Sequence, residues 1–169
     1  MLVLGIDPGI AITGYGLVRT EQKKDYSCID YGIISTEAGL PDADRLKILY
    51  EALSELIQHH RPDTSAVENL FFQKNVKTAF SVGQARGVAI LTLAQAGLSI
   101  AEYNPNEIKQ TVCGYGGADK IQIQRMVQTL LNLDQCPKPD DAADALAVAI
   151  CHINHQAFND RIQQALTSS

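Results

Sequence analysis

The chain has 169 residues, of which 46% are apolar and 20% charged, and its formal net charge at pH 7 is −5. This length suits a single domain with a substantial core. No run approaches the roughly 20 apolar residues of a membrane span, and no basic segment precedes the apolar start as in a signal peptide. The four cysteines lack the spacing of a zinc or disulfide framework. We therefore expect a cytoplasmic protein with reduced thiols.

Apolar alternation and helical spacing predict five strands and five helices. The strands are expected at residues 2–6, 14–19, 26–35, 65–68 and 98–103, and the helices at residues 46–61, 76–96, 105–112, 119–132 and 141–156. A three-stranded antiparallel meander followed by two parallel strands predicts an α/β fold. Its mixed five-stranded sheet would carry helices on both faces. We predict a single domain over residues 1–157 and a C-terminal tail at residues 158–169.

Two glycines interrupt the helix predicted at residues 76–96. Gly83 and Gly87 lie one turn apart, and each costs about 1 kcal/mol relative to alanine inside a helix. Such a pair indicates close approach of another backbone. A neighbouring strand and the helix of a second copy are both consistent with the pattern.

Four carboxylates in three places carry the chemistry. Asp7 and Glu68 end predicted strands, and Asp141 and Asp144 lie three residues apart at the start of the last helix. Ligands in open α/β sheets bind beyond the carboxyl ends of the strands, and residues three apart share one helix face. Crowded carboxylates repel one another unless a hard cation such as Mg²⁺ neutralises them. The set therefore predicts metal-dependent phosphoryl chemistry, in which two cations clamp the reacting phosphate.

Other polar residues near these acids have simpler explanations. Asp140 is expected to cap the last helix. All four histidines are assigned to structural roles, with His152 and His155 on the surface of that helix.

Basic residues gather in the middle of the chain. Residues 69–125 contain six lysines and arginines against three acids, so they are basic although the whole chain is acidic. Nucleic-acid binding needs a local basic surface, but a solvated helix face explains the same pattern. Within this stretch, Phe71 and Phe72 precede Lys74 and Lys77. Such a segment offers a platform for an unstacked base, worth about 1–3 kcal/mol per base. We expect one ring to be exposed, with Phe71 favoured, and the other to be core.

The stretches GIDPGIAITGYG, AVENLFFQKN, GQARGVAI, IKQTVCGYGGADK and DDAADALAVAI together resemble the RuvC family of Holliday-junction resolvases. The resemblance covers residues 1 to about 155. It implies a ribonuclease H-like fold and a homodimeric endonuclease that nicks two opposed strands of a four-way DNA junction symmetrically. The ends would be 5′-phosphate and 3′-hydroxyl, and the context homologous recombination and DNA repair.

The resemblance also assigns residues. The catalytic and metal-binding acids fall on Asp7, Glu68, Asp141 and Asp144, with Asp140 as an extra acid. The lysines near the scissile strand match Lys109 and Lys120, and the DNA-stacking aromatic matches Phe71. It implies two Mg²⁺ per site, with Mn²⁺ able to substitute, and RuvA–RuvB as the branch-migration partner.

Two other interpretations remain open. The segment from Asp7 to Gly14 also suits a phosphate-binding hairpin of the actin and sugar-kinase type, although such proteins normally need two such domains. The second interpretation is a ribonuclease H-like enzyme that acts on RNA, or a junction-binding protein that has lost its activity. The presence of all four acids argues against a loss of activity.

Overall fold

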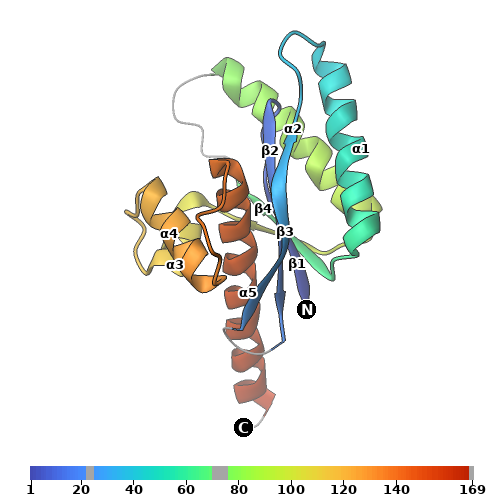
Figure 1. Cartoon of the computed structure of the whole chain (residues 1–169). Helices are drawn as coiled ribbons and strands as arrows, with labels where there is room; N and C mark the ends of the chain where they lie inside the picture. Colours follow the sequence, from blue (N-terminus) through green and yellow to red (C-terminus); the bar gives the residue numbers. More distant parts are fainter. Residues whose placement is uncertain (22–24, 70–75, 168–169) are drawn as a thin grey trace.

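The computed structural model describes residues 1–21, 25–69 and 76–167, apart from the side chains of residues 76–78 (Figure 1). Within these residues, five strands form one sheet in the order β3-β2-β1-β4-β5. They are β1 (Leu2–Asp7), β2 (Ile12–Thr20), β3 (Tyr26–Ser35), β4 (Thr64–Glu68) and β5 (Ile100–Tyr103). β1, β2 and β3 pair antiparallel, whereas β4 runs parallel to β1 and β5. The predicted mixed sheet and its meander are confirmed.

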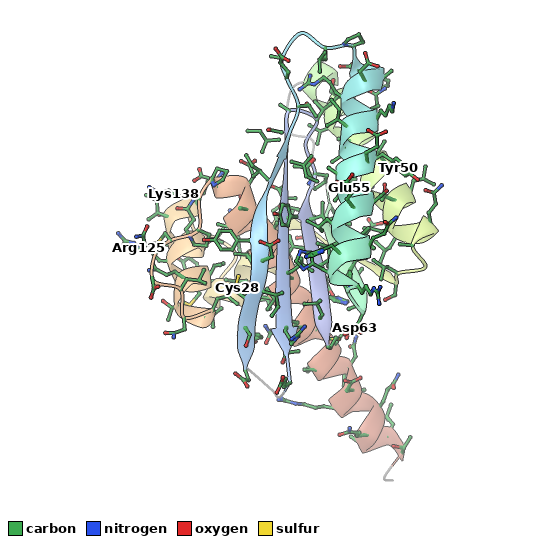
Figure 2. The ribbon with its side chains drawn as sticks, turned by 45° about the vertical axis from the view of Figure 1, so that its right-hand side comes forward. Cys28, Tyr50, Glu55, Asp63, Arg125 and Lys138 are labelled. Atoms are coloured by element: carbon green, nitrogen blue, oxygen red, sulfur yellow. The ribbon has the colours of Figure 1, made fainter. Side chains whose placement is uncertain are left out.

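Five helices in the described part of the chain cover both faces of this sheet. They are α1 (Asp42–His60), α2 (Val76–Gln95), α3 (Pro105–Cys113), α4 (Lys120–Leu130) and α5 (Asp140–Thr167). α1 and α2 lie on one face, and α5 lies on the other with α3 and α4 beside it (Figure 1). The outer surfaces carry polar side chains such as Glu55 on α1 and Arg125 on α4 (Figure 2). None of the described helices has the length and apolarity needed to cross a membrane.

The last helix is longer than predicted. α5 continues to Thr167 instead of ending near residue 156, and its end extends past the sheet (Figure 1). Residues 157–167 contain no proline or glycine, so nothing in the chain breaks the helix there. The helix crosses the predicted boundary between domain and tail, and that division stays a prediction.

Alternation along β1 separates two cores. Leu4 and Ile6 pack with α1 and α2, whereas Val3 packs with α5, and all three are fully buried. Because side chains alternate between the faces of a strand, Gly5 and Asp7 point to the same side as Val3. The first strand therefore directs its terminal carboxylate toward α5.

The close backbone approach lies at different glycines from those predicted. In the part of the chain that the structure describes, a Cβ on Gly83 or Gly87 would meet nothing within 4 Å. Of the two alternatives, approach of a neighbouring strand is therefore wrong. Instead, a Cβ on Gly5 would lie 2.2 Å from the Ala145 carbonyl oxygen, and one on Gly16 would lie 2.8 Å from the Leu146 nitrogen. Gly5 and Gly16 are paired across β1 and β2. Because these two residues have no side chain, the backbone of α5 packs directly against β1 and β2.

His152 is buried, so its expected place on the helix surface is wrong. Only 5% of the residue is exposed. Its ring contacts the Tyr103 hydroxyl at 2.9 Å and the Thr64 hydroxyl at 3.0 Å. Burial, aided by nearby His155, lowers the pKa of His152 to about 4. A neutral imidazole therefore joins α5 to β4 and β5, which is a structural role.

We predict that Gly5→Ala lowers the free energy of unfolding by about 1–3 kcal/mol, the usual cost of overpacking a close-packed core. The added methyl would overlap backbone atoms of α5, which cannot rotate away as a side chain can. Urea denaturation measures the change. Gly117→Ala is the matched control, because its Cβ would meet only ordinary contacts at 3.6 Å. Equal stability of the two variants would contradict the proposed packing.

Candidate active site

Two carboxylates lie side by side at the end of the sheet. Ile6 of β1 is opposite Val67 of β4 in the parallel register, so the next residues, Asp7 and Glu68, are neighbours. Both point to the face covered by α5. The two carboxyl groups are close enough for each to influence the pKa of the other.

The start of α5 brings the other two carboxylates to this point. Gly14 is opposite Asp7 across β1 and β2. A Cβ on Gly14 would lie 1.9 Å from the Asp141 carbonyl oxygen, so only glycine allows the first turn of α5 to come this close. Asp141 and Asp144 thereby come within electrostatic reach of Asp7. The structure thus brings the four acids that the sequence predicted to the same end of the sheet.

Burial and mutual repulsion disfavour ionisation of this cluster. Burial, followed by the charges of Glu68, Asp144 and Asp141, raises the pKa of Asp7 well above its usual value. Burial and Asp144 raise the pKa of Glu68, against the opposing effects of the Asp7 hydrogen bond and of Lys109 and Lys120. Burial also raises the pKa of Asp144, against the opposing effect of Lys120. These shifts show that a positive charge at this point would be strongly favoured.

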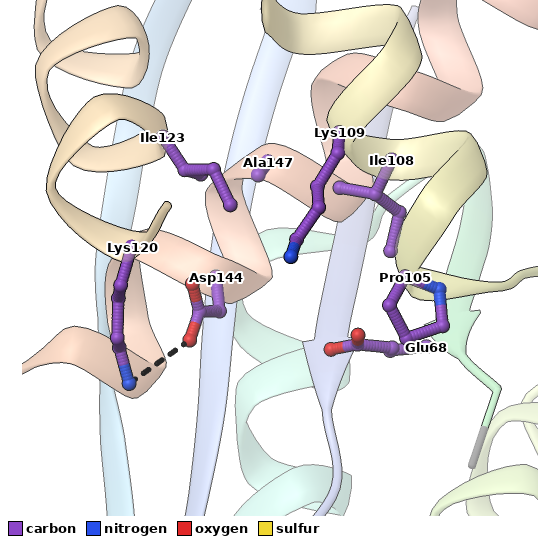
Figure 3. Close-up of a pocket in the computed structure, with 8 residues that line it drawn as sticks. All are labelled: Glu68, Pro105, Ile108, Lys109, Lys120, Ile123, Asp144 and Ala147. Carbon is purple, nitrogen blue, oxygen red and sulfur yellow. Dashed lines mark ion pairs between the residues drawn. The ribbon is translucent and has the colours of Figure 1, made fainter. Parts of the chain in front are cut away.

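Two lysines from separate helices face the acids across a cavity of about 190 Å³. Lys109 lies on α3 and extends into the space between Asp144 and Glu68, while Lys120 opens α4 (Figure 3). The walls are apolar and consist of Pro105, Ile108, Ile123 and Ala147.

Capping boxes fix the starts of both lysine-bearing helices. Asn104 and Glu107 exchange hydrogen bonds at α3, and Asp119 and Gln122 do so at α4. Each box satisfies amide groups that the helix itself leaves unpaired. Lys120 is the residue that follows its cap, so the capping box holds its backbone in place beside the acids.

Asp140 does not act as the predicted cap. It is the first residue of α5, and its carboxylate accepts a hydrogen bond from Gln124 at 2.7 Å and pairs with Lys120 at 3.3 Å. Lys120 also pairs with Asp144 at 3.4 Å. Gln124 was missed by the sequence analysis, because a surface glutamine carries no signal of its own.

The acids are suited to a hard divalent cation by their chemistry. Four carboxylates supply the oxygen ligands that Mg²⁺ and Mn²⁺ take. Among the described residues, however, no three histidine, cysteine or acidic side chains already converge as a ready-made metal group. Lys120 occupies one side of Asp144, at 3.4 Å from its carboxylate.

The predicted basic stretch does not form one continuous surface in the described part of the chain. Lys109 and Lys120 line the cavity, but Arg86 pairs with Glu102, and Arg125 lies on the outer side of α4 (Figure 2). Four further residues predicted to contact DNA lie partly or wholly outside the described part: Phe71, Phe72, Lys74 and the side chain of Lys77.

We predict that Asp7→Asn stabilises the protein in EDTA above pH 5. A carboxyl whose pKa is raised by folding stabilises the folded state below its unfolded pKa of about 3.9 and loses that contribution as pH rises through the folded value. Asparagine cannot ionise, so the variant escapes this loss. Thermal melts across pH 4–9 should show a melting temperature several degrees higher for Asp7→Asn, with the difference growing with pH. A difference that is independent of pH would contradict the raised pKa.

Comparison with known proteins gives a consistent family. A family model described as crossover junction endodeoxyribonuclease RuvC matches residues 3–152. The RuvC of Ruminiclostridium cellulolyticum, which carries that enzyme name, is 55% identical over 154 residues, covering 91% of this chain and 92% of the relative. The relative of the same name from Halothermothrix orenii is 55% identical over 159 residues, covering 94% and 96%.

A solved structure agrees with these relatives. The RuvC of Thermus thermophilus in complex with a Holliday junction substrate has a TM-score of 0.90 and 31% identity to this chain, covering 94% of this chain and 96% of that one. The predicted ribonuclease H-like architecture is therefore confirmed. With the family model, the relatives and the fold in agreement, this chain belongs to the RuvC family of crossover junction endodeoxyribonucleases.

Proposed function

We propose that this chain resolves Holliday junctions by nicking two opposed strands symmetrically, and that it does so in homologous recombination and DNA repair. The ends would be 5′-phosphate and 3′-hydroxyl. The observation that carries the proposal is the site itself. Glu68 and Asp144 line one cavity with Lys109 and Lys120, and the charges of Glu68, Asp144 and Asp141 all act on Asp7. Relatives at 55% identity have the matching enzyme name. The Thermus thermophilus relative was solved in complex with a Holliday junction substrate.

The four acids would hold two Mg²⁺ ions, and we expect Mn²⁺ to substitute for them. Bound divalent cations lower the pKa of water and neutralise charge that develops on a reacting phosphate. The raised pKa values of Asp7 and Glu68 favour their protonated forms, and a proton held there must leave when a cation binds. Lys109 and Lys120, at the opposite wall of the cavity, would neutralise the scissile phosphate and its neighbours.

Besides Lys109 and Lys120, the DNA-contact residues proposed from the sequence are Phe71, Phe72, Lys74 and Lys77. Phe71 follows Glu68 by three residues. We propose that its ring stacks on a base that is unpaired at the crossover, where unstacking is less costly than in a continuous duplex.

Two such sites are needed to cut opposed strands, and α2 is the surface that we propose joins two copies into a homodimer. Phe80 and Leu91 on α2 are 68% and 53% exposed. Between them, a Cβ on Gly83 or Gly87 would meet no atom of the described residues within 4 Å. The glycines therefore leave room for the helix of a second copy. We also propose a cytoplasmic location and cooperation with RuvA–RuvB, as the family resemblance implies.

We predict that Asp7→Asn abolishes junction cleavage but not junction binding. The substitution keeps the shape of the side chain and removes one ligand charge, and loss of even an outer partner of a metal site costs about 10–100-fold. Cleavage of an end-labelled mobile four-way junction in Mg²⁺ should fall at least about a hundredfold, while a gel shift shows an unchanged complex.

The matched control is Asp160→Asn, which removes the same charge from the exposed far end of α5 and should cleave like the wild type. A linear duplex should remain uncut by both proteins. Near-normal cleavage by Asp7→Asn would refute the site, and preferential cleavage of RNA junctions would redirect the substrate assignment.

We predict that Gly87→Leu converts the dimer into monomers without unfolding the chain. Leucine would fill the gap that we assign to the second copy, and it is also a better helix former than glycine by up to about 1 kcal/mol. Light scattering coupled to gel filtration measures the mass. Glu55→Leu, on the exposed side of α1 (Figure 2), should remain dimeric. A Gly87→Leu variant with the wild-type mass would exclude α2 as the interface.

A further inference from the structure

An acid outside the catalytic four is built into the edge of the site. Asp140 uses both of its carboxylate oxygens on α4, since Oδ1 accepts from the Gln124 amide at 2.7 Å and Oδ2 pairs with the Lys120 ammonium at 3.3 Å. Lys120 in turn lies 3.4 Å from Oδ2 of Asp144. Lys120 is thus shared between two carboxylates of α5.

The two helices match each other by one turn. Asp140 and Asp144 are four residues apart on α5, and Lys120 and Gln124 are four residues apart on α4. Residues at this spacing lie on the same face of a helix. The two pairs therefore face each other across the contact between α4 and α5. Lys120 lies between Asp140 and Asp144, and Gln124 donates a hydrogen bond to Asp140.

This arrangement matters because Lys120 and a divalent cation compete for Asp144. Each is attracted to the same carboxylate, and each repels the other. Lys120 is also a residue that we place at the scissile phosphate, so the site has to keep it close without letting it neutralise Asp144 completely. A second acceptor beside Lys120 meets both requirements.

We propose that Asp140, oriented by Gln124, is a positioning residue that draws Lys120 partly away from Asp144 and so keeps the Asp144 carboxylate available to a divalent cation. This inference rests on the proposed metal-dependent function, which it deepens.

Asp140 is badly placed to be a cation ligand itself. Its side chain is 55% exposed, compared with 23% for Asp144. The acids whose charges raise the pKa of Asp7 are Glu68, Asp144 and Asp141, and Asp140 is not among them. Asp140 therefore stands at the rim, on the α4 side of the cluster.

The test measures Mn²⁺ binding to the full-length protein without DNA, from the electron paramagnetic resonance signal of free Mn²⁺. We compare the wild type with Asp140→Asn, Lys120→Met, the double variant and Gln124→Leu. Gln124→Leu releases Asp140 without changing any charge. Asp160→Asn, at the other end of the same helix, controls for the loss of one negative charge, and 0.15 M salt limits long-range effects to about 8 Å.

We expect Asp140→Asn to weaken Mn²⁺ binding roughly twofold to fivefold, the range typical of exposed ion pairs. Gln124→Leu should weaken it less, and Lys120→Met should strengthen it. In the Lys120→Met background, Asp140→Asn should have a clearly smaller effect, because the lysine through which it mainly acts is gone and only its direct charge on Asp144 remains. The Mg²⁺ concentration for half-maximal junction cleavage should rise in Asp140→Asn, with junction affinity unchanged.

The double variant, Asp140→Asn with Lys120→Met, shows whether Asp140 acts through Lys120 or directly on the cation. If Asp140→Asn weakens Mn²⁺ binding equally with and without Lys120, Asp140 acts through its own charge or as a ligand, and the proposal is overturned. An unchanged Mn²⁺ affinity in Asp140→Asn would also overturn the proposal. The proposed function would still stand in that case if the wild-type protein cuts junctions in Mg²⁺. A wild-type protein that neither binds Mn²⁺ nor cuts junctions would instead overturn the proposed function, and this inference with it.

Discussion

The site depends on the short distance between α5 and the sheet. Gly5, Gly14 and Gly16 leave β1 and β2 without side chains where the helix crosses them, and the alanines of the helix present little bulk in return. A larger side chain at these glycines would push α5 outward. Asp141 and Asp144 would then move away from Asp7 and Glu68, although every acid was still present. The geometry of the acid cluster is therefore determined by backbone packing at glycines, which have no side-chain chemistry of their own.

This packing assembles a cluster that opposes folding in the absence of a cation. Burial and mutual repulsion raise the pKa of Asp7, Glu68 and Asp144, so ionising them at neutral pH costs stability. The surrounding structure offsets this cost. Fully buried apolar residues on both faces of β1 supply the two cores, and the neutral His152 ties α5 to β4 and β5. The cost of ionising the acids arises at one point of the fold, whereas the packing that offsets it extends over both faces of the sheet.

Much of this was readable from the sequence. Alternation and helical spacing gave the element order, and strand ends together with the spacing of Asp141 and Asp144 identified the acids. Tertiary contacts decided the remainder. Gly83 and Gly87 stand out in the sequence because glycine destabilises a helix by about 1 kcal/mol. Gly5 and Gly16 do not stand out, because glycine has several uses in strands. His152 looked exposed because nothing local reveals Tyr103 and Thr64 as partners. Gln124 and Asp140 meet only after α4 and α5 pack together.

The acids and the lysines of the site come from different parts of the fold. The acids come from the sheet and from the helix packed most closely on it, where backbone contacts hold them in place. The lysines come from α3 and α4, two short capped helices at the edge of the cavity. Acids fixed by the core suit cation binding, which needs defined oxygen positions. Lysines on long flexible stems suit a phosphate that arrives and leaves, since an ammonium acts as a point charge and tolerates displacement. A lysine this close to the acids also partly neutralises them, and Asp140 offers Lys120 a second carboxylate at 3.3 Å beside that of Asp144 at 3.4 Å.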